Sequence, residues 1–276
     1  MSQRQIDPVF ATTTAIGYRD ADGGGTGFFI NHNERTFIVT NRHVVNPEEE
    51  DCNPTEAHVW FRNATNIGQA NRNPIRLVKD GSPTWYDHPA APEAVDLALI
   101  PINPRLSSLD VLDDDSQQVQ SGNLAFTLDH IIHENIRADQ RVSIIGYPGD
   151  FMDRTTRLPI RRNALIASPY GYGFEDNPYF LTDARMHPGT SGSPVVMDVG
   201  AMQTTHGEVP SHRNKSLYLI GIHSATFYGT SFDEQRLEER TEADREIEEE
   251  ADIQLDLNVA WYPQLLTDIL ESIDWG

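Results

Sequence analysis

The octapeptide His187-Pro188-Gly189-Thr190-Ser191-Gly192-Ser193-Pro194 carries the strongest local signal in this chain. Glycines on both sides of a serine, with a proline behind them, are typical of a tight backbone turn. Such a turn can expose the Ser191 hydroxyl and aim neighbouring backbone N–H groups at one point in front of it. That arrangement suits a nucleophile with an oxyanion hole. Taken alone, the octapeptide is equally compatible with a turn that has no chemical role.

Two motifs upstream supply the other groups that serine chemistry needs. A serine nucleophile requires a base to take its proton and a carboxylate to orient that base. The run Thr40-Asn41-Arg42-His43-Val44-Val45 places His43 at the end of a strand-like stretch. The run Val95-Asp96-Leu97-Ala98-Leu99 places Asp96 among apolar residues, where an unpaired carboxylate would be costly. The alternatives are a structural histidine and a strand-edge or capping aspartate, but the order of the three motifs favours the chemical interpretation.

Short runs of β-branched and aromatic residues, separated by turn residues, predict many strands. They lie at 9–18, 26–30, 36–40, 58–61, 75–78 and 95–100, and then at 141–148, 163–167, 179–182, 194–197, 217–223 and 253–261. Many short strands with turns between them indicate a sandwich or barrel, and nothing in the chain alternates strands with helices. The apolar residues of 262–274 recur at helical spacing behind Pro263, which predicts a C-terminal helix.

These motifs together resemble the trypsin-like (chymotrypsin-fold) serine peptidases. The family's landmarks are a Gly-x-Gly-Phe hairpin before the histidine, an Asp-Leu-Ala-Leu strand and Gly-x-Ser-Gly-x-Pro, and the match is closest to disulfide-free bacterial and glutamyl-endopeptidase-like members. The resemblance implies an all-β fold of two antiparallel six-stranded β-barrels with a C-terminal α-helix. The expected division is a barrel at 8–104 with His43 and Asp96, a connection at 105–138, and a barrel at 139–276 with Ser191. The second barrel includes an acidic insertion at 233–252.

The resemblance also implies the reaction of a serine endopeptidase acting on a protein or peptide substrate without a cofactor. Ser191 would attack the scissile carbonyl, His43 would shuttle the proton, and Asp96 would stabilise the imidazolium. The backbone N–H groups of Gly189 and Ser191 would hold the oxyanion. One position departs from trypsin, which has an aspartate just before the nucleophile that pairs with a new N-terminus after zymogen cleavage. Thr190 stands there in this chain, so that activation route is expected to be absent.

The same resemblance places the primary specificity (P1) pocket at His223, Ser224, Ala225 and Arg185. Glutamyl endopeptidases carry a histidine at the position of His223, where it contacts the substrate carboxylate. A histidine and an arginine would bind a carboxylate through charge-assisted hydrogen bonds. We therefore predict a P1 preference for Glu, with Asp or Gln as alternatives. The competing interpretation is that His223 is a buried strand histidine and that Arg185 turns outward to Asp183.

The charge of the chain is strongly negative: 42 acidic and 21 basic residues give a net charge of −21. Only Lys79 and Lys215 are lysines. Nucleic acid and anionic membranes are poor partners for such a surface. An acidic, lysine-poor composition resembles that of proteins from salt-rich cytoplasm, while the simpler interpretation is an acidic protein with one acidic loop. The single cysteine, Cys52, allows no intrachain disulfide, and Met1–Asp7 has no apolar signal core, so we expect a cytoplasmic protein.

Two further features leave alternatives open. The acidic segment 233–252 could bind a regulatory partner or be a solvated insertion, so the function could also be that of a latent protease activated by a partner or ligand. A catalytically silent scaffold that binds peptides is the other alternative. The histidine pairs His130–His133 and His206–His212 lack the order or setting of a zinc site, so no metal is expected.

Overall fold

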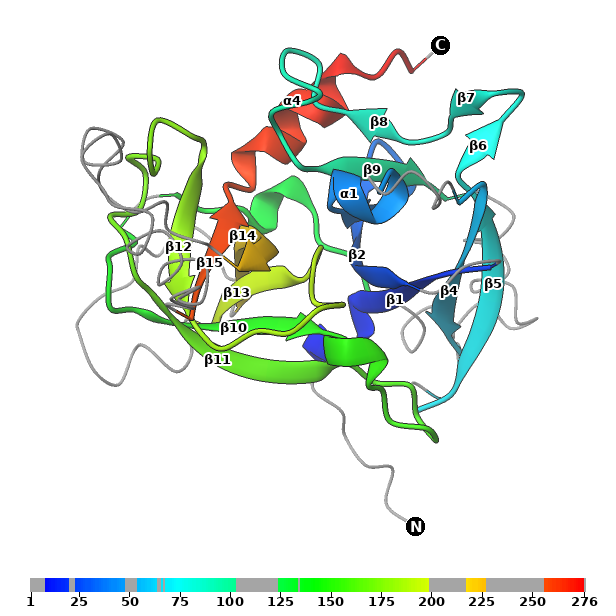
Figure 1. Cartoon of the computed structure of the whole chain (residues 1–276), viewed down its shortest axis with the longest axis horizontal. Helices are drawn as coiled ribbons and strands as arrows, with labels where there is room; N and C mark the ends of the chain where they lie inside the picture. Colours follow the sequence, from blue (N-terminus) through cyan, green and yellow to red (C-terminus); the bar gives the residue numbers. More distant parts are fainter. Residues whose placement is uncertain are drawn as a thin grey trace, which may run out of the picture.

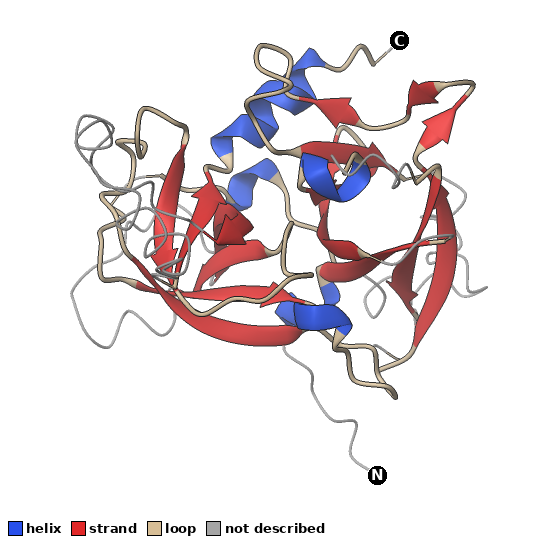
Figure 2. Cartoon of the chain, in the orientation of Figure 1, coloured by secondary structure: helices blue, strands red, loops and turns tan. Residues whose placement is uncertain are grey.

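The computed structural model describes residues 8–19, 23–47, 54–63, 66, 68–102, 124–133, 135–198, 217–226 and 256–275. Two antiparallel β-structures lie side by side, and the helix near the C-terminus lies across them (Figure 1). Strands dominate the ribbon, as Figure 2 shows. The predicted fold class is confirmed. Within the described part of the chain, no helix is long and apolar enough to cross a membrane.

The first structure is an antiparallel sheet of seven strands in the order β5-β4-β1-β2-β3-β9-β8. Its strands are β1 (Thr13–Tyr18), β2 (Gly24–His32), β3 (Arg35–Thr40), β4 (Glu56–Arg62), β5 (Ala70–Arg76), β8 (Tyr86–Asp87) and β9 (Ala98–Pro101). A separate ribbon pairs β6 (Val78–Lys79) with β7 (Ser82–Pro83). Six strands were predicted here, and the sheet has seven because the two-residue β8 also pairs with β9.

The β2–β3 hairpin separates two parts of the hydrophobic core. Successive side chains of a strand point to opposite faces. Phe28 and Ile30 therefore join the cluster between the two β-structures, while Phe29 joins the cluster inside the first sheet. The hairpin turns at Asn33 and Glu34, whose φ angles are 48° and 60°. Two central residues with positive φ are typical of a two-residue type I′ turn, whose twist matches that of the flanking strands.

The second structure is a closed six-stranded barrel. Its strands, in order around the barrel, are β10 (Arg141–Gly146), β11 (Ile160–Ile166), β12 (Tyr179–Asp183), β15 (Leu257–Trp261), β14 (Leu217–Thr226) and β13 (Pro194–Asp198). Val142, Phe180, Val195 and Ile220 are all buried in one apolar cluster of this barrel. Closure leaves no free sheet edge, so the backbone hydrogen bonds of the barrel are satisfied internally.

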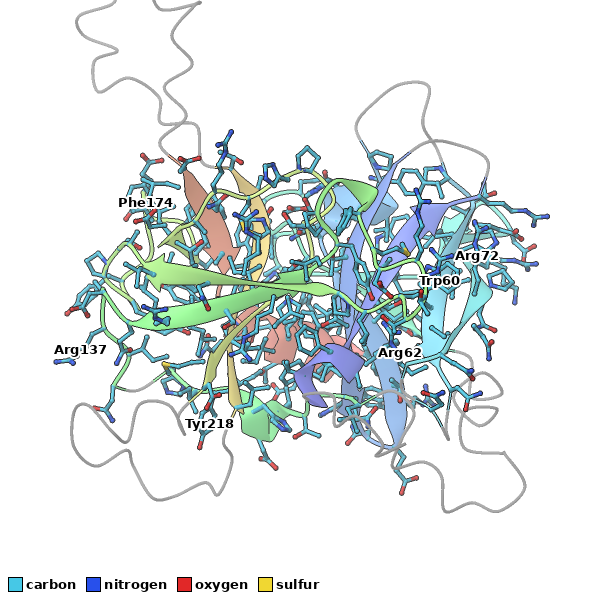
Figure 3. All side chains as sticks on the ribbon, turned by 90° about the horizontal axis from the view of Figure 1, so that it is seen from below. Trp60, Arg62, Arg72, Arg137, Phe174 and Tyr218 are labelled. Carbon is cyan, nitrogen blue, oxygen red and sulfur yellow. The ribbon has the colours of Figure 1, made fainter. Side chains whose placement is uncertain are left out.

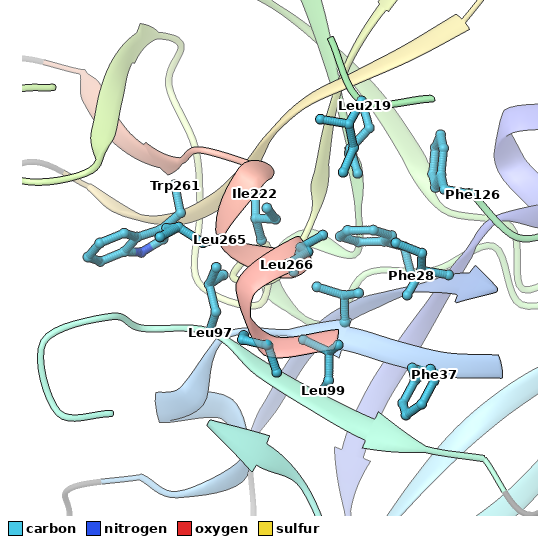
Figure 4. Close-up of a cluster of buried hydrophobic side chains, with 14 of the residues drawn as sticks. Phe28, Phe37, Leu97, Leu99, Phe126, Leu219, Ile222, Trp261, Leu265 and Leu266 are labelled. Carbon is cyan, nitrogen blue, oxygen red and sulfur yellow. The ribbon is translucent and has the colours of Figure 1, made fainter. Parts of the chain in front are cut away.

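The C-terminal helix α4 (Gln264–Ser272) lies within the predicted range 262–274. Its buried residues Leu265 and Leu266 join Leu99 of β9, Leu97 just before that strand, and Ile222 from the barrel (Figure 4). A fully buried leucine contributes about 1.5–3 kcal/mol relative to an exposed one. This shared cluster therefore holds the two β-structures in one relative position, which a site built from both of them requires.

A second connection lies at Arg62, the largest fully buried side chain among the described residues. Its guanidinium donates to Tyr147 Oη at 3.1 Å and to the carbonyls of Thr156 and Arg157. Arg157 in turn stacks over Trp60, with its guanidinium carbon 5.1 Å from the ring centroid. Burial lowers the pKa of Arg62 and raises the pKa of Tyr147 to about 12. Strand β4, which carries Trp60 and Arg62 (Figure 3), thus holds the segment 147–157 of the second half.

Candidate active site

His43 and Asp96 form the polar centre of the site. His43 lies in α1 (Arg42–Val45), a single helical turn directly after β3, and Asp96 precedes β9 rather than lying inside a strand. The backbone N–H of His43 donates to Asp96 Oδ1 at 2.9 Å, and His43 Nδ1 lies 2.8 Å from Asp96 Oδ2. A carboxylate can only accept, so Nδ1 carries the proton of this bond and Nε2 keeps its lone pair in a neutral ring. The predicted His–Asp pair is therefore present in a geometry suited to a general base.

Two more groups hold the aspartate. Asn41 Nδ2 donates to the main-chain carbonyl of Asp96 at 2.7 Å, and Ser224 Oγ donates to its Oδ2 at 2.6 Å. Ser224 comes from β14 of the barrel, so the carboxylate is bound from both β-structures. The side chain of Ser224 was predicted only as part of the P1 pocket. The contact with Asp96 lies outside what the local sequence pattern could indicate.

Ser191 lies against strand β2 of the first sheet. Its carbonyl accepts a hydrogen bond from the Thr26 N–H at 2.8 Å. A Cβ atom on Gly25 would lie 2.8 Å from a methyl group of Val44 and 3.0 Å from Ser191 O, so only glycine fits between them. In the part of the chain that the structure describes, no hydrogen bond joins the Ser191 hydroxyl to His43. Catalytic hydrogen bonds are often long without substrate and shorten in the Michaelis complex.

The turn before the nucleophile has a defined type. The Thr190 N–H donates to His187 O at 3.3 Å, and Gly189 has a φ of 88°. A proline followed by a glycine with φ near +80° is the signature of a type II turn. The carbonyl of Pro188 accepts the Gly149 N–H at 2.5 Å. Since the C=O and N–H of a trans peptide point in opposite directions, the Gly189 N–H faces away from Gly149.

The Gly189 and Ser191 N–H groups were predicted to form the oxyanion hole. Within the described residues, neither group donates a hydrogen bond to a backbone or side-chain acceptor. Buried or half-buried N–H groups are normally paired. Two free donors separated by one residue, one of them on the serine itself, are therefore available to a developing oxyanion.

The four residues predicted for the P1 pocket differ in burial: His223 and Ser224 are buried, and Arg185 and Ala225 are exposed. His223 is buried in β14, with Nε2 3.1 Å from Thr190 Oγ1. Burial, and secondarily the charge of nearby His43, lowers the pKa of His223 to about 3. Arg185 and Ala225 are exposed, and no hydrogen bond or ion pair between Arg185 and His223 occurs in the described part. The structure thus agrees with a buried His223, which the sequence left open as an alternative.

Two predicted features lie beyond the described residues, namely the acidic segment 233–252 and the pair His206–His212. In the described ranges, no group of three or more His, Cys, Asp or Glu side chains is placed to hold a metal ion.

Thr26 is a structural residue of the site that the sequence did not single out. Its Oγ1 donates to Gly189 O at 2.8 Å and accepts the Tyr147 N–H at 3.0 Å, while its own carbonyl accepts Thr40 Oγ1 at 2.8 Å. Both threonines are fully buried. The signal available in the sequence was a polar residue between two glycines in an otherwise apolar strand.

The chain matches the family model of the trypsin-like peptidase domain over residues 25–202. No curated protein sequence matches it. Among solved structures, it is similar to the MamO protease domain from Magnetospirillum magneticum, with 16% identity, coverage of 97% of this chain and 98% of the other, and a TM-score of 0.50. Others are the inactive form of Rv3671c from M. tuberculosis H37Rv (14% identity, 97% and 91% coverage, TM-score 0.46) and a serine endoprotease from Yersinia pestis (17% identity, 97% and 66% coverage, TM-score 0.48).

The MamO likeness concerns the fold, and the family match covers both the His43 and the Ser191 motifs. On the strength of the family match over more than half of its length, the chain belongs to the trypsin-like peptidase domain family and is a serine endopeptidase of the trypsin-like type.

Proposed function

We propose that this endopeptidase cleaves its substrate through a covalent acyl-enzyme at Ser191, with His43 as general base and Asp96 as the carboxylate that orients it. The observation that carries the proposal is the 2.8 Å contact between His43 Nδ1 and Asp96 Oδ2. It fixes the proton on Nδ1, so that Nε2 is the nitrogen able to take the hydroxyl proton. His43 and Asp96 belong to the proposed first domain (8–104), and Ser191 belongs to the second (139–276).

The reaction follows from these roles. Ser191 Oγ attacks the carbonyl carbon while its proton moves to His43 Nε2, and the carbonyl oxygen becomes an anion. The free N–H groups of Gly189 and Ser191 stabilise that anion. The imidazolium then gives its proton to the leaving amine as the C–N bond breaks, and the acyl group stays on Ser191. Water, activated by the same imidazole, releases the acid and restores the serine. Asp96 remains ionised and stabilises the imidazolium during both acylation and deacylation.

The proposed P1 preference is for Glu, with Asp and Gln as alternatives. Its support is the position of His223 directly before Ser224, whose hydroxyl binds Asp96. The Nε2 of His223 is already hydrogen-bonded to Thr190, and Arg185 is exposed. A substrate carboxylate would therefore have to compete with Thr190 for the imidazole N–H.

The setting that we propose is the cytoplasm of a salt-adapted organism, supported by the net charge of −21 and the single cysteine. A regulatory partner at 233–252 would make the enzyme latent, and a silent peptide-binding scaffold would leave Ser191 unreactive. A labelled fluorophosphonate separates these cases, because it reacts only with a serine activated by its base.

The deciding experiment combines labelling with a panel of peptides that differ at P1, at low and multimolar salt, with Ser191→Ala as the blank. Labelling at Ser191 and cleavage after Glu would support both the triad and the pocket. Hydrolysis after Arg or Phe but not Glu would retain the triad and exclude the proposed pocket. Labelling without hydrolysis of any peptide would point to a latent enzyme. A folded protein with neither labelling nor hydrolysis would exclude the proposed mechanism.

A further inference from the structure

The turn that carries the Gly189 N–H is held from several sides. The Pro188 carbonyl is bound by the Gly149 N–H, which belongs to the 3-10 helix Pro148–Asp150 after β10. The Gly189 carbonyl is bound by Thr26 Oγ1 from β2 of the first sheet. These bonds fix the two carbonyls of the turn, but they leave the side chain of Thr190 to be held by something else.

Thr190 is held by the buried imidazole of His223. The Thr190 hydroxyl donates its proton to His187 O at 2.7 Å, so toward the ring, 3.1 Å away, it can only accept. The Nε2 of His223 must therefore carry a proton and donate it to Thr190 Oγ1. A neutral ring with its proton on Nε2 leaves Nδ1 as an acceptor, and Nδ1 is buried without a hydrogen-bond partner among the described residues.

The backbone of His223 is bound to the same loop. Its N–H donates to Ser193 O at 2.9 Å, and its carbonyl accepts the Gly192 N–H at 2.8 Å. His223 and Thr190 are 1% and 2% exposed, so water cannot replace the bond between them. Breaking a buried hydrogen bond leaves both partners unsatisfied, which costs more than the bond's net contribution. The low pKa of His223, caused mainly by burial, keeps the ring in the neutral form that this bond requires at neutral pH.

We propose that His223 and Thr190 are positioning residues of the oxyanion hole: the Nε2–H···Oγ1 bond holds the turn 187–190 in the type II form before substrate binds. The inference rests on the proposed function, because it assigns the Gly189 N–H to the oxyanion. It gives His223 a role other than contact with the P1 side chain. The turn then forms without a new N-terminus, a ligand or a partner protein.

The two roles of His223 predict different kinetics. If the ring holds the turn, its loss lowers the rate of the chemical step for every substrate. If the ring contacts the P1 side chain of the substrate, loss of the ring changes the selectivity among P1 residues. A hydrogen bond contributes about 0.5–1.5 kcal/mol net, and 1.4 kcal/mol corresponds to a tenfold change. We therefore expect a loss of about tenfold in kcat when this bond is removed.

The test compares Thr190→Val, which removes the hydroxyl but keeps the shape, with Thr190→Ser, which keeps it. The measurements are kcat and KM for peptides with Glu, Gln, Arg and Phe at P1, and the affinity of a peptide boronate that forms a tetrahedral adduct with the serine. For Thr190→Val we expect kcat to fall by the same factor for all four peptides, and the affinity for the boronate to fall by a similar factor. KM should change less than about twofold. Thr190→Ser should restore most of the loss. His223→Gln, which keeps an N–H donor near the Nε2 position, should lose less kcat than His223→Leu.

An unaltered kcat in a folded Thr190→Val variant would overturn the proposal, as would a loss confined to the Glu substrate or a change in KM alone. Spectra of the ¹⁵N-labelled histidine rings give a readout that needs no activity, with His223→Gln to assign the signal. We expect a neutral ring with its proton on Nε2 from about pH 5 to pH 8. A protonated ring or the Nδ1–H tautomer would also exclude the bond. If wild-type protein shows neither hydrolysis nor fluorophosphonate labelling, the proposed function fails, and the spectra still decide whether the bond exists.

Discussion

At the scale of single residues, Asp96 is the point where the site's hydrogen bonds converge. Its carboxylate accepts the His43 N–H, His43 Nδ1 and the hydroxyl of Ser224. The backbone bond fixes Oδ1, and the other two share Oδ2. Because a hydrogen bond to a charged acceptor is stronger than a neutral one, the 2.6 Å bond from Ser224 should contribute to the alignment of the carboxylate with the imidazole.

We predict that Ser224→Ala lowers kcat about tenfold, because Asp96 keeps both contacts with His43 but loses one charge-assisted bond. KM should change less, since the bond orients the base and does not hold the substrate in place. Steady-state kinetics on one cleaved peptide measures the effect. Ser143→Ala is the matched control: that serine is also buried, but its hydroxyl accepts Arg161 Nε in the barrel and is not among the hydrogen-bond partners of Asp96 in the described residues. Equal losses in both variants would contradict the assignment.

His223 makes a separate prediction about acid stability. Burial lowers its pKa in the folded protein to about 3, from an ordinary value of 6.5. Between these values the unfolded chain binds a proton that the folded chain does not. The free energy of unfolding therefore falls as pH drops below about 6.5, by up to about 1.4 kcal/mol per pH unit, and levels off near pH 3.

Denaturant unfolding of wild type and His223→Gln between about pH 7 and pH 4 measures that contribution. Glutamine does not titrate, so the variant should lose less stability on acidification. The difference between the two curves isolates one group, because the other titrating residues are common to both proteins. Parallel curves would show that the ring does not stay neutral in the folded state.

At the scale of elements, the site depends on how closely β2 and β3 approach the nucleophile loop. A Cβ on Gly192 would lie 2.0 Å from Thr26 O and 2.5 Å from Thr40 Oγ1, and its φ is 86°. Gly171 has nearly the same φ, 90°, but nothing lies within 4 Å of the position of its Cβ. The two glycines therefore separate backbone strain from steric crowding.

We predict that Gly171→Ala costs about 1–2 kcal/mol of unfolding free energy, the cost of an L-residue in a left-handed conformation, and leaves kcat within about twofold. Gly192→Ala should cost several kcal/mol more and abolish activity, because β2 or the loop must shift. Thermal unfolding and fluorophosphonate labelling measure both effects. A Gly192→Ala variant as stable and reactive as Gly171→Ala would show that the loop is not packed against β2 in the way described.

The sequence allowed the elements to be predicted better than their contacts. The strands β2 and β3 were predicted because their apolar residues are local and continuous, and α4 because its apolar residues recur at helical spacing. The bond between Thr26 and Gly189 joins residues 163 positions apart, and no local pattern contains it. The same limit applies to Thr190 and His223. Each residue was identified because it lies beside a motif, but the hydrogen bond between them depends on the closure of the barrel.

At the scale of the whole molecule, two connections fix the β-structures relative to each other. One is the apolar cluster around α4, and the other is the polar contact of Arg62 with the segment 147–157. The Gly149 N–H that binds Pro188 belongs to this segment. The orientation of the Gly189 peptide is therefore linked, through Gly149 and Tyr147, to the first sheet, so the site forms only when both halves are folded and docked.

The net charge of −21 sets the expected response of this assembly to salt. Like charges destabilise a compact state, and salt screens them over about 10 Å at 0.1 M and about 3 Å at 1 M. For a salt-adapted protein we expect the thermal midpoint and kcat/KM to keep rising from about 0.1 M to about 2 M KCl. An acidic protein with one acidic loop would reach its plateau at a few tenths molar, where exposed charges are already screened. Sucrose at equal osmolality is the control, because it stabilises folded proteins by exclusion without screening charge. A midpoint that is flat above about 0.3 M KCl, or that rises equally in sucrose, would show that the acidic surface is not an adaptation to high salt.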